Sequence, residues 1–204
     1  VQVFDQVGST NLAGKRWAID GAPHGALLVA CRQTAGRGRL GRSFESPPGG
    51  LYLSVVLRPR AGDTAAVLIT AAAAVAVCRS VSALCGLELS IKWVNDLFVG
   101  GKKCCGILTE AGTGMESGSI EYMVVGIGIN YTTRPADLGE TESVAGSLYP
   151  GGTAPLPRAR LAADIHRRLL QAFEALDTRE FLAEYRERSL VIGNMVTVMA
   201  KCPY

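Results

Sequence analysis

Apolar residues fall into short runs over the first two thirds of the chain and take helical spacing near its end. The runs predict strands, because four to eight apolar or alternating residues bounded by turn residues are typical of a strand. These strands are expected at residues 1–7, 27–31, 51–57, 87–93 and 120–129. The pair Gly100-Gly101 predicts a further hairpin, with strands at 96–99 and 102–110.

Helices are expected at residues 12–20, 64–84, 157–176 and 178–189. Ser9 or Thr10 can cap the first helix, and Gly86 can end the second. The second helix carries only Arg79 as a charge, so we expect it to lie largely buried across a sheet. Because strands come early and paired helices late, the fold class is α+β with a mixed sheet rather than a doubly wound one.

The last residues predict a change of structure. Residues 132–153 are expected to form a surface loop with a short helical piece, and residues 191–199 begin like a strand. We interpret 1–190 as one domain and 191–204 as the beginning of a small β-domain. The chain opens without methionine inside an expected strand, which suggests that an N-terminal portion is missing.

Composition is that of a globular protein, with 48% hydrophobic and 19% charged residues among 204. The net charge of +3 is too small to indicate a nucleic-acid binder. The cations are instead local, since four arginines fall within eleven residues that contain no acid: Arg32, Arg37, Arg39 and Arg42. Such a cluster indicates a small anionic ligand.

Cysteines and hydropathy bear on the compartment. The six cysteines have no zinc-type spacing, and reduced buried thiols suggest a cytoplasmic protein. No metal site is expected from side-chain clusters. The longest uncharged run, residues 64–78, looks too short to span a bilayer, so we expect no membrane partner.

Residues 33–42 (QTAGRGRLGR) combine glycines and arginines in one loop between two expected strands. We call this segment the arginine loop. It matches the letters of a dinucleotide fingerprint and nearly those of a P-loop. Both motifs need a helix immediately afterwards, and residues 44–50 (FESPPGG) cannot form one. An anion-handling loop and a merely solvated loop both remain open.

A second constellation surrounds the expected hairpin. Lys92 precedes Asn95-Asp96 and could form a structural ion pair there, whereas Lys103 has no acidic neighbour in sequence. A lysine in an apolar strand is costly unless it meets an anion. Consecutive strand residues face opposite sides, so Lys102 and Lys103 cannot both enter a site. Lys103, next to an apolar run, has the stronger case, and Lys102 beside the Gly100-Gly101 turn would then face solvent. Ser9-Thr10-Asn11 could cap a helix only, or also contact a ligand.

Five motifs in register now carry a resemblance: residues 9–11 (STN), 36–42 (GRGRLGR), 92–96 (KWVND), 103–108 (KCCGIL) and 126–130 (GIGIN). Over nearly the whole chain they resemble the catalytic domain of biotin protein ligases. The resemblance implies a class II aminoacyl-tRNA-synthetase-like fold, followed by an SH3-like domain. It also implies a two-step reaction, in which ATP and biotin form biotinyl-5′-AMP and the biotinyl group passes to a lysine of a biotin carrier domain.

The resemblance assigns roles residue by residue. Lys103 and Arg39 would be catalytic. Biotin would be held by Ser9, Thr10, Asn11, Gln33, Arg37, Gly38, Arg39, Lys103, Gly106 and Gly126. ATP or the adenylate would be held by Arg37, Arg39, Phe44, Asn95, Lys103 and Asn130. Mg²⁺ would accompany ATP, the carrier protein would be the partner, and a homodimer is compatible with the family.

Two positions depart from the family pattern. Phe44 stands where many members have tryptophan, and Val94 where many have proline, which leaves that turn less rigid. No DNA-binding domain precedes residue 1 in this sequence, so a repressor role is not expected. The alternatives are a lipoate or octanoate ligase of related fold and a nucleic-acid-binding domain. The 6% aromatic content and local charge disfavour the second.

Overall fold

The computed structural model describes residues 1–59, 64–114, 119–134, 136–138 and 144–197. Within them, the strands form one mixed sheet in the order β1-β2-β3-β7-β6-β5-β4. β1 pairs with β2 in parallel, and the other neighbours are antiparallel. The strands are β1 (Gln2–Phe4), β2 (Ala26–Ala30), β3 (Leu51–Leu57), β4 (Ser90–Lys92), β5 (Asp96–Val99), β6 (Lys102–Thr113) and β7 (Ile120–Ile129). The α+β prediction is confirmed.

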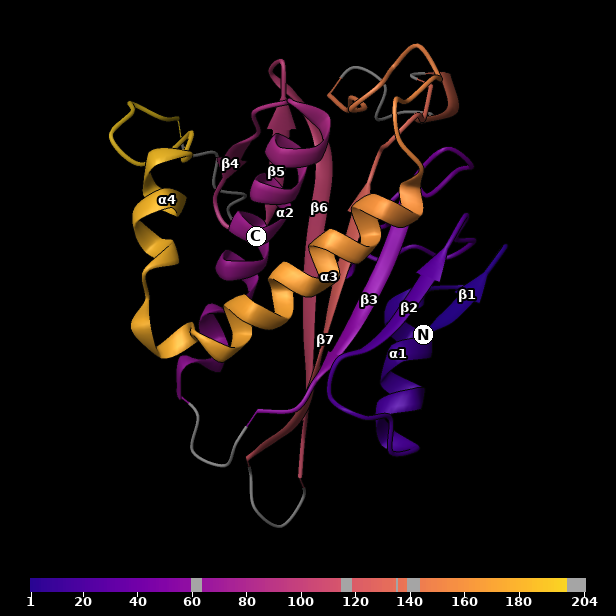
Figure 1. Ribbon diagram of the computed structural model, residues 1–204, viewed down its shortest axis with the longest axis vertical. Helices are drawn as coiled ribbons and strands as arrows, with labels where there is room; N and C mark the ends of the chain where they lie inside the picture. Colours follow the sequence, from indigo (N-terminus) through magenta and orange to yellow (C-terminus); the bar gives the residue numbers. More distant parts are fainter. Residues whose placement is uncertain (60–63, 115–118, 135, 139–143, 198–204) are drawn as a thin grey trace, which may run out of the picture.

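Helices cover both faces of this sheet. They are α1 (Thr10–Ile19), α2 (Ile69–Cys85), α3 (Arg158–Glu174) and α4 (Phe181–Glu187). α2 and α3 pack on one face, and α1 lies against β2, β3 and β7 on the other (Figure 1). All seven residues of β3 are therefore buried, although its sequence mostly alternates. The strand lies between two apolar layers, and the sheet separates the smaller layer under α1 from the main core under α2 and α3.

The helix over the sheet is more apolar than its uncharged run suggested. Ala66–Cys85, which consists of α2 and the end of the 3₁₀ turn η2 (Thr64–Leu68), is long and apolar enough to cross a membrane by length and composition alone. The expectation that the apolar segment is too short to span a bilayer was therefore wrong. Most of the segment is buried against the sheet and α3, which accounts for its composition. Gly86 ends α2 as predicted, with φ +65° in the left-handed region.

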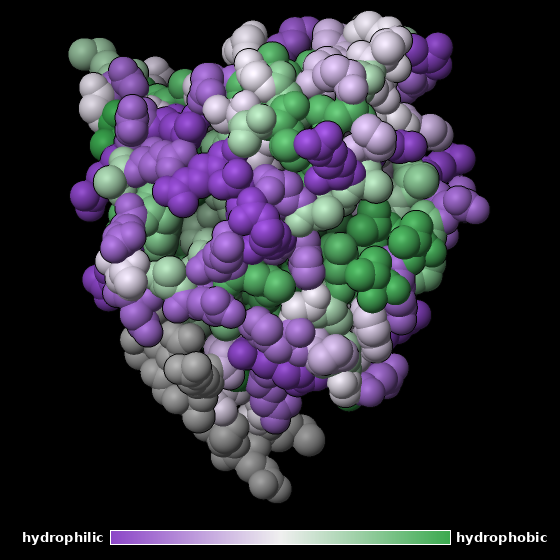
Figure 2. Space-filling view, in the orientation of Figure 1, coloured by the Kyte–Doolittle hydropathy of each residue, from purple (hydrophilic) through white to green (hydrophobic). Residues whose placement is uncertain are grey.

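α3 follows Pro157 and buries Leu161, Ala162, Ile165 and Leu169 against the core. Its outer face is charged, and hydrophilic side chains run across this side of the molecule over α3 (Figure 2). The next predicted helix is shorter than expected, because Arg179 adopts a left-handed conformation between η4 (Leu176–Thr178) and α4.

Several expected boundaries were wrong. The strand expected at 1–7 is only β1, with Val7 making an isolated bridge to Gln33, and the strand expected at 87–93 is only β4. Residues 136–138 form the short helical piece expected in the loop, while 135 and 139–143 lie outside the described residues.

The C-terminal strand is not seen where the structure describes the chain. Residues 191–197 form a turn and irregular chain, and 198–204 lie outside the described residues. The hydroxyl of Ser189 accepts hydrogen bonds from the backbone N–H groups of Val191 and Ile192, which turns the chain at this point. The division at residue 190 and the small β-domain stay predictions.

Candidate active site

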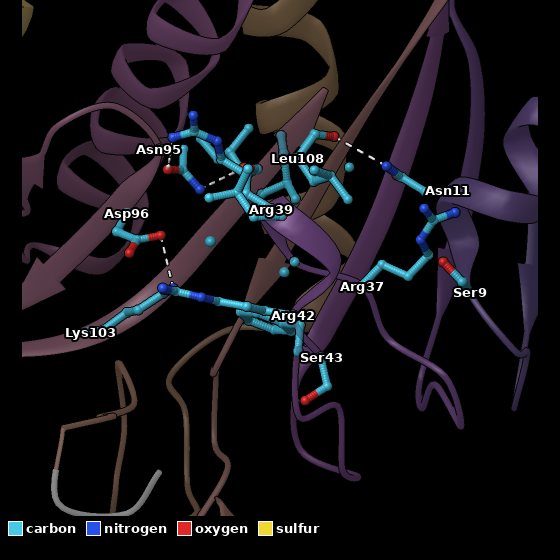
Figure 3. A pocket seen from close by; sticks show the side chains of 18 of the residues that line it. Ser9, Asn11, Arg37, Arg39, Arg42, Ser43, Asn95, Asp96, Lys103 and Leu108 are labelled. Atoms are coloured by element: carbon cyan, nitrogen blue, oxygen red, sulfur yellow. Dashed lines mark hydrogen bonds and ion pairs between the residues drawn. The ribbon is translucent and has the colours of Figure 1, made fainter. Parts of the chain in front are cut away.

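A cavity of about 340 Å³ opens on the α1 side of the sheet. Its walls come from the start of α1, the arginine loop, the β5–β6 hairpin and the middle of β7 (Figure 3). All but one of the predicted site residues line it: Ser9, Thr10, Asn11, Gln33, Arg37, Gly38, Arg39, Phe44, Asn95, Lys103, Gly106 and Gly126. The structure therefore brings motifs between residues 9 and 128 into one place.

Ser9 caps α1, as predicted, by accepting a hydrogen bond from the backbone N–H of Leu12 at 3.5 Å. The cap orients the helix so that the first residues, Thr10 and Asn11, are buried against the sheet and face the cavity. Capping and ligand contact are therefore compatible at this helix start. The described hydrogen bonds leave the hydroxyl proton of Ser9 available to a ligand.

Thr10 can offer a ligand only a lone pair. Its hydroxyl donates to Gln33 Oε1 at 3.1 Å, and Ser54 Oγ lies 2.8 Å from the same hydroxyl oxygen. Its single proton is therefore used within the protein. Gln33 Oε1 also accepts from the backbone N–H of Thr10 at 2.8 Å, which fixes the side of the amide that faces the helix.

Gln33 is held from its other end as well. Its Nε2 donates to Ser46 Oγ at 2.9 Å, and Ser46 Oγ in turn donates to the backbone oxygen of Phe44. The second amide proton of Gln33 is left for the cavity. Gly36 allows this close packing, because a Cβ there would lie 2.5 Å from Ser46 Oγ.

Asn11 is oriented in the same manner. Its Nδ2 donates to the backbone oxygen of Leu108 at 3.1 Å and to Glu110 Oε2 at 3.0 Å, which uses both amide protons. Its Oδ1 accepts from Ser54 Oγ at 2.7 Å and lies over Gly126, where a Cβ would be only 2.0 Å away. Gly126 thus makes room for Asn11, and this end of the cavity presents acceptors from both Asn11 and Thr10.

The arginine loop borders the cavity from the Ser9 side to the β4–β5 turn. Its 3₁₀ turn η1 (Arg39–Gly41) places Leu40 at φ +57° with the side chain 89% exposed. Arg39 Nη1 donates to Asn95 Oδ1 at 3.1 Å and so reaches across to the β4–β5 turn. Arg37 Nη2 lies 3.4 Å from Glu110 Oε1, on the Ser9 side of the cavity (Figure 3). The loop is thus not merely solvated, because its guanidinium groups line a cavity.

Lys103 enters the cavity and Lys102 faces solvent, as strand parity predicted. Lys103 has no acidic neighbour in sequence, but it has one in space, because its Nζ lies 2.8 Å from Asp96 Oδ1 across the hairpin. Apart from this ammonium group, the described residues give Asp96 Oδ1 no partner, although the atom is buried. Lys92 instead stands over the ring of Phe98, so the ion pair considered for Lys92 is formed by Lys103.

The ring of Phe44 lies over two glycines that pair across β6 and β7. A Cβ on Gly106 would lie 2.9 Å from the ring, and one on Gly128 would lie 2.6 Å away. Lys103 Nζ stands 5.8 Å from the ring centroid. The paired glycines create a flat floor on which an aromatic ring rests beside a cation, an arrangement suited to a stacked heteroaromatic ligand.

Asn130 is the predicted site residue that the structure does not place in the cavity lining. It is buried where β7 ends, and its Nδ2 donates to the backbone oxygen of Gly146 at 2.9 Å. Its Oδ1 has no hydrogen-bond partner among the described residues. In this structure the Asn130 side chain connects the end of β7 to the following loop by this hydrogen bond.

The residues of the site and its support that sequence reasoning missed include Trp93, Asp96, Ser54 and Glu110. Trp93 is 68% exposed and lines the cavity beside Asp96. Ser54 and Glu110 lie behind the lining and hold Asn11. The available signals were a serine within an apolar strand and a carboxylate inside another strand, both of which need partners when buried.

The cysteines beside Lys103 are not nucleophiles. Burial raises the pKa of Cys104 to about 12 and raises that of Cys105 well above its usual value. Both thiols therefore stay protonated near neutral pH. The described cysteines are free, as expected, and the described residues contain no group of three or more His, Cys, Asp or Glu that could hold a metal ion.

Comparison with known proteins now gives the family. The profile of the biotin/lipoate A/B protein ligase family matches residues 3–130. The chain belongs to this family. Along 97% of its length the chain is 35% identical to the biotin--[acetyl-CoA-carboxylase] ligase of Mycobacterium tuberculosis, covering 74% of that protein.

Other members of the ligase family are longer. The chain is 38% identical to the bifunctional ligase/repressor BirA of Bacillus subtilis over 157 residues, which is 76% of this chain and 48% of BirA. It thus spans about half the length of the curated relatives it first matches. Among solved structures, biotin protein ligase from Aquifex aeolicus in complex with biotin and ATP superposes with a TM-score of 0.78 at 27% identity, over 92% of this chain and 77% of the other.

Proposed function

We propose that this domain uses ATP to activate biotin as biotinyl-5′-AMP and transfers the biotinyl group to a lysine of a biotin carrier domain, such as that of acetyl-CoA carboxylase. The observation that carries the proposal is one cavity with two chemically different ends. Neutral hydrogen-bonding groups stand at the start of α1, and Arg39 and Lys103 stand at the other side. Biotin has the same division, with a neutral urea ring at one end and a carboxylate at the other.

The neutral end matches the urea ring group by group. The ring has two N–H donors and one carbonyl acceptor. Thr10 Oγ1 and Asn11 Oδ1 are acceptors toward the cavity, while Ser9 and Gln33 keep protons to donate. Between the two ends the apolar side chain of Leu108 lines the wall beside the aliphatic chain of biotin.

In the first step a carboxylate oxygen of biotin attacks the α-phosphorus of ATP. The bond from that phosphorus to the bridging oxygen breaks, pyrophosphate leaves, and a mixed anhydride, biotinyl-5′-AMP, remains. Negative charge grows on the phosphate oxygens, so cations already in place lower the barrier. Lys103 reaches both reactants, Arg39 and Asn95 face the nucleotide, and Phe44 supports the adenine ring, while Arg37 borders the cavity on the Ser9 side.

In the second step the neutral ε-amine of the carrier lysine attacks the acyl carbon. AMP leaves with the bonding electrons, and the amine loses a proton as the amide forms. The exposed rim at Trp93 and Leu40 is the side from which a lysine on another protein can enter.

Mg²⁺ would arrive with ATP. This ion usually takes one or two protein carboxylates together with phosphate oxygens, and Asp96 is the carboxylate among the cavity residues described. The donor set therefore fits a metal carried by the nucleotide, which would neutralise phosphate charge. The carrier partner, homodimer formation and a cytoplasmic location stay predictions, and we propose no nucleic-acid or membrane partner.

A transfer assay tests both steps. The purified domain, ATP, Mg²⁺ and biotin are incubated with an isolated biotin carrier domain, and the carrier is weighed by mass spectrometry. We expect a gain of one biotinyl group that depends on ATP and is absent from a carrier with Lys→Arg at its acceptor position. An unmodified carrier under conditions where a known ligase modifies it would overturn the proposal.

A further inference from the structure

Glu110 stands behind the cavity and contacts three residues from two segments, α1 and the arginine loop. It lies in β6, and its side chain is only 15% exposed. Oε2 accepts from Asn11 Nδ2 at 3.0 Å, while Oε1 lies 3.4 Å from Arg37 Nη2 and 3.5 Å from Lys15 Nζ. Glu110 itself does not line the cavity. One carboxylate thus joins the start of α1 to the arginine loop.

The contact with Asn11 decides which side of the amide faces a ligand. A carboxylate accepts hydrogen bonds and cannot donate them, and the backbone oxygen of Leu108 is also an acceptor. Both therefore require Nδ2 of Asn11, which leaves Oδ1 on the cavity side. Without Glu110, Leu108 and Ser54 still contact the amide, but the Ser54 hydroxyl can accept as well as donate, so only the Leu108 oxygen still requires Nδ2. A rotated Asn11 would turn N–H groups toward the N–H groups of a urea ring.

The contact with Arg37 places the first guanidinium of the arginine loop. Ion pairs of 3.4–3.5 Å with cations that are 42% and 32% exposed add about 0–1 kcal/mol to stability. The contact therefore serves geometry more than folding. Because Lys15 shares the same oxygen, the carboxylate keeps a positive partner when Arg37 shifts toward an anionic ligand.

We propose that Glu110 is a positioning residue for biotin, which holds Asn11 Oδ1 toward the urea ring and holds Arg37 at the entrance to the arginine loop. This inference rests on the proposed function and adds a residue that acts through others. It predicts an effect on biotin binding rather than on the chemical step, since the urea ring is remote from the reacting carboxylate and is held alike in ground and transition states.

The test compares Glu110→Ala and Glu110→Gln with the parent and with Glu121→Gln, an exposed glutamate of the neighbouring strand. Biotin affinity is measured by titration calorimetry, and the biotin KM and kcat by ATP–pyrophosphate exchange. We expect Glu110→Ala to weaken biotin binding and raise KM about 10-fold, as for loss of one charged hydrogen bond, with kcat within about 3-fold. Glu110→Gln can still accept from Asn11 and should lose less.

A double-mutant cycle separates positioning from a general structural role. Adding Glu110→Ala to Asn11→Ala should weaken biotin binding less than in the parent, because the residue it orients is already gone. Unchanged biotin affinity in Glu110→Ala, or full additivity with Asn11→Ala, would overturn the inference. If the parent itself neither binds biotin nor catalyses exchange, the proposed function falls, and this inference with it.

Discussion

Lys103 Nζ and Asp96 Oδ1 lie 2.8 Å apart across the β5–β6 hairpin. The pair holds the ammonium group at the cavity wall, 5.8 Å from the Phe44 ring centroid. Lys102, the preceding residue, is exposed, and its side chain passes Gly146 instead. Two adjacent lysines therefore have separate surroundings, and their substitution gives a matched comparison.

Lys103→Ala should reduce biotin-dependent ATP–pyrophosphate exchange about 10²–10³-fold, because the variant lacks a cation that faces charge developing at the phosphate. Lys102→Ala should stay within a few-fold of the parent, since an exposed charge contributes within about 0.5 kcal/mol to stability. Circular dichroism checks that both variants fold. The reverse ranking would mean that the cavity does not use Lys103.

Arg39 should retain the adenylate until the carrier lysine arrives. Its guanidinium extends over the cavity to Asn95 and so fastens the loop across the opening. Arg39→Gly removes this connection, and we expect free biotinyl-5′-AMP to escape and label bystander proteins in a mixture. Labelling is followed by streptavidin blot, with Arg32→Gly, outside the cavity lining, as control. A variant that still modifies only the carrier would rule out this role.

Gly128→Ala should weaken ATP binding while sparing biotin binding. The added methyl group would lie 2.6 Å from the Phe44 ring and displace it from the glycine floor. We expect the KM for ATP to rise about 10-fold and the KM for biotin to change less than 3-fold, as a stacked ring contributes about 0.5–1.5 kcal/mol beyond its buried area. Gly151→Ala, at an open position without a positive φ, controls for glycine replacement. An equal rise in both KM values would contradict a separate adenine floor.

Trp93 should matter for the second step more than for the first. Its side chain is 68% exposed at the rim, where a carrier domain has to approach. Trp93→Ala should leave pyrophosphate exchange within about 3-fold and reduce kcat/KM for the carrier about 10-fold or more, since exposed aromatic residues often dominate contact energy. Aminolysis of the adenylate by hydroxylamine, a small acceptor, should remain normal. A matching loss in exchange would instead place Trp93 in the nucleotide site.

Strand and helix locations followed from local patterns, since Leu51–Leu57 and Ile120–Ile129 have the predicted bounds. The shared cavity was expected only through the family resemblance, because the motifs are far apart in sequence. The Asp96–Lys103 pair depends on strand pairing across the hairpin. The roles of Ser54 and Glu110 could not be predicted for the same reason, as each acts on Asn11 from a distant strand.

The position of Asn130 shows a further limit. Its place in the 126–130 motif predicted contact with the nucleotide, which stays a prediction, and the structure shows its amide donating to the backbone oxygen of Gly146. A motif carries the residue type but not the direction of its side chain. The C-terminal turn at Ser189 likewise depends on a side-chain hydrogen bond that an apolar pattern does not reveal.

The most direct test of the account is ATP–pyrophosphate exchange by the isolated domain with biotin, lipoate or octanoate offered separately. The cavity end formed by Thr10, Asn11 and Gln33 suits a ligand with both N–H and carbonyl groups, such as the urea ring of biotin. Lipoate and octanoate have no urea ring. Sites that bind polar groups discriminate strongly against ligands lacking them. We predict exchange with biotin at least 100-fold faster than with either alternative. The account would be contradicted if lipoate or octanoate supported exchange as well as biotin does, or if none of the three acids supported exchange.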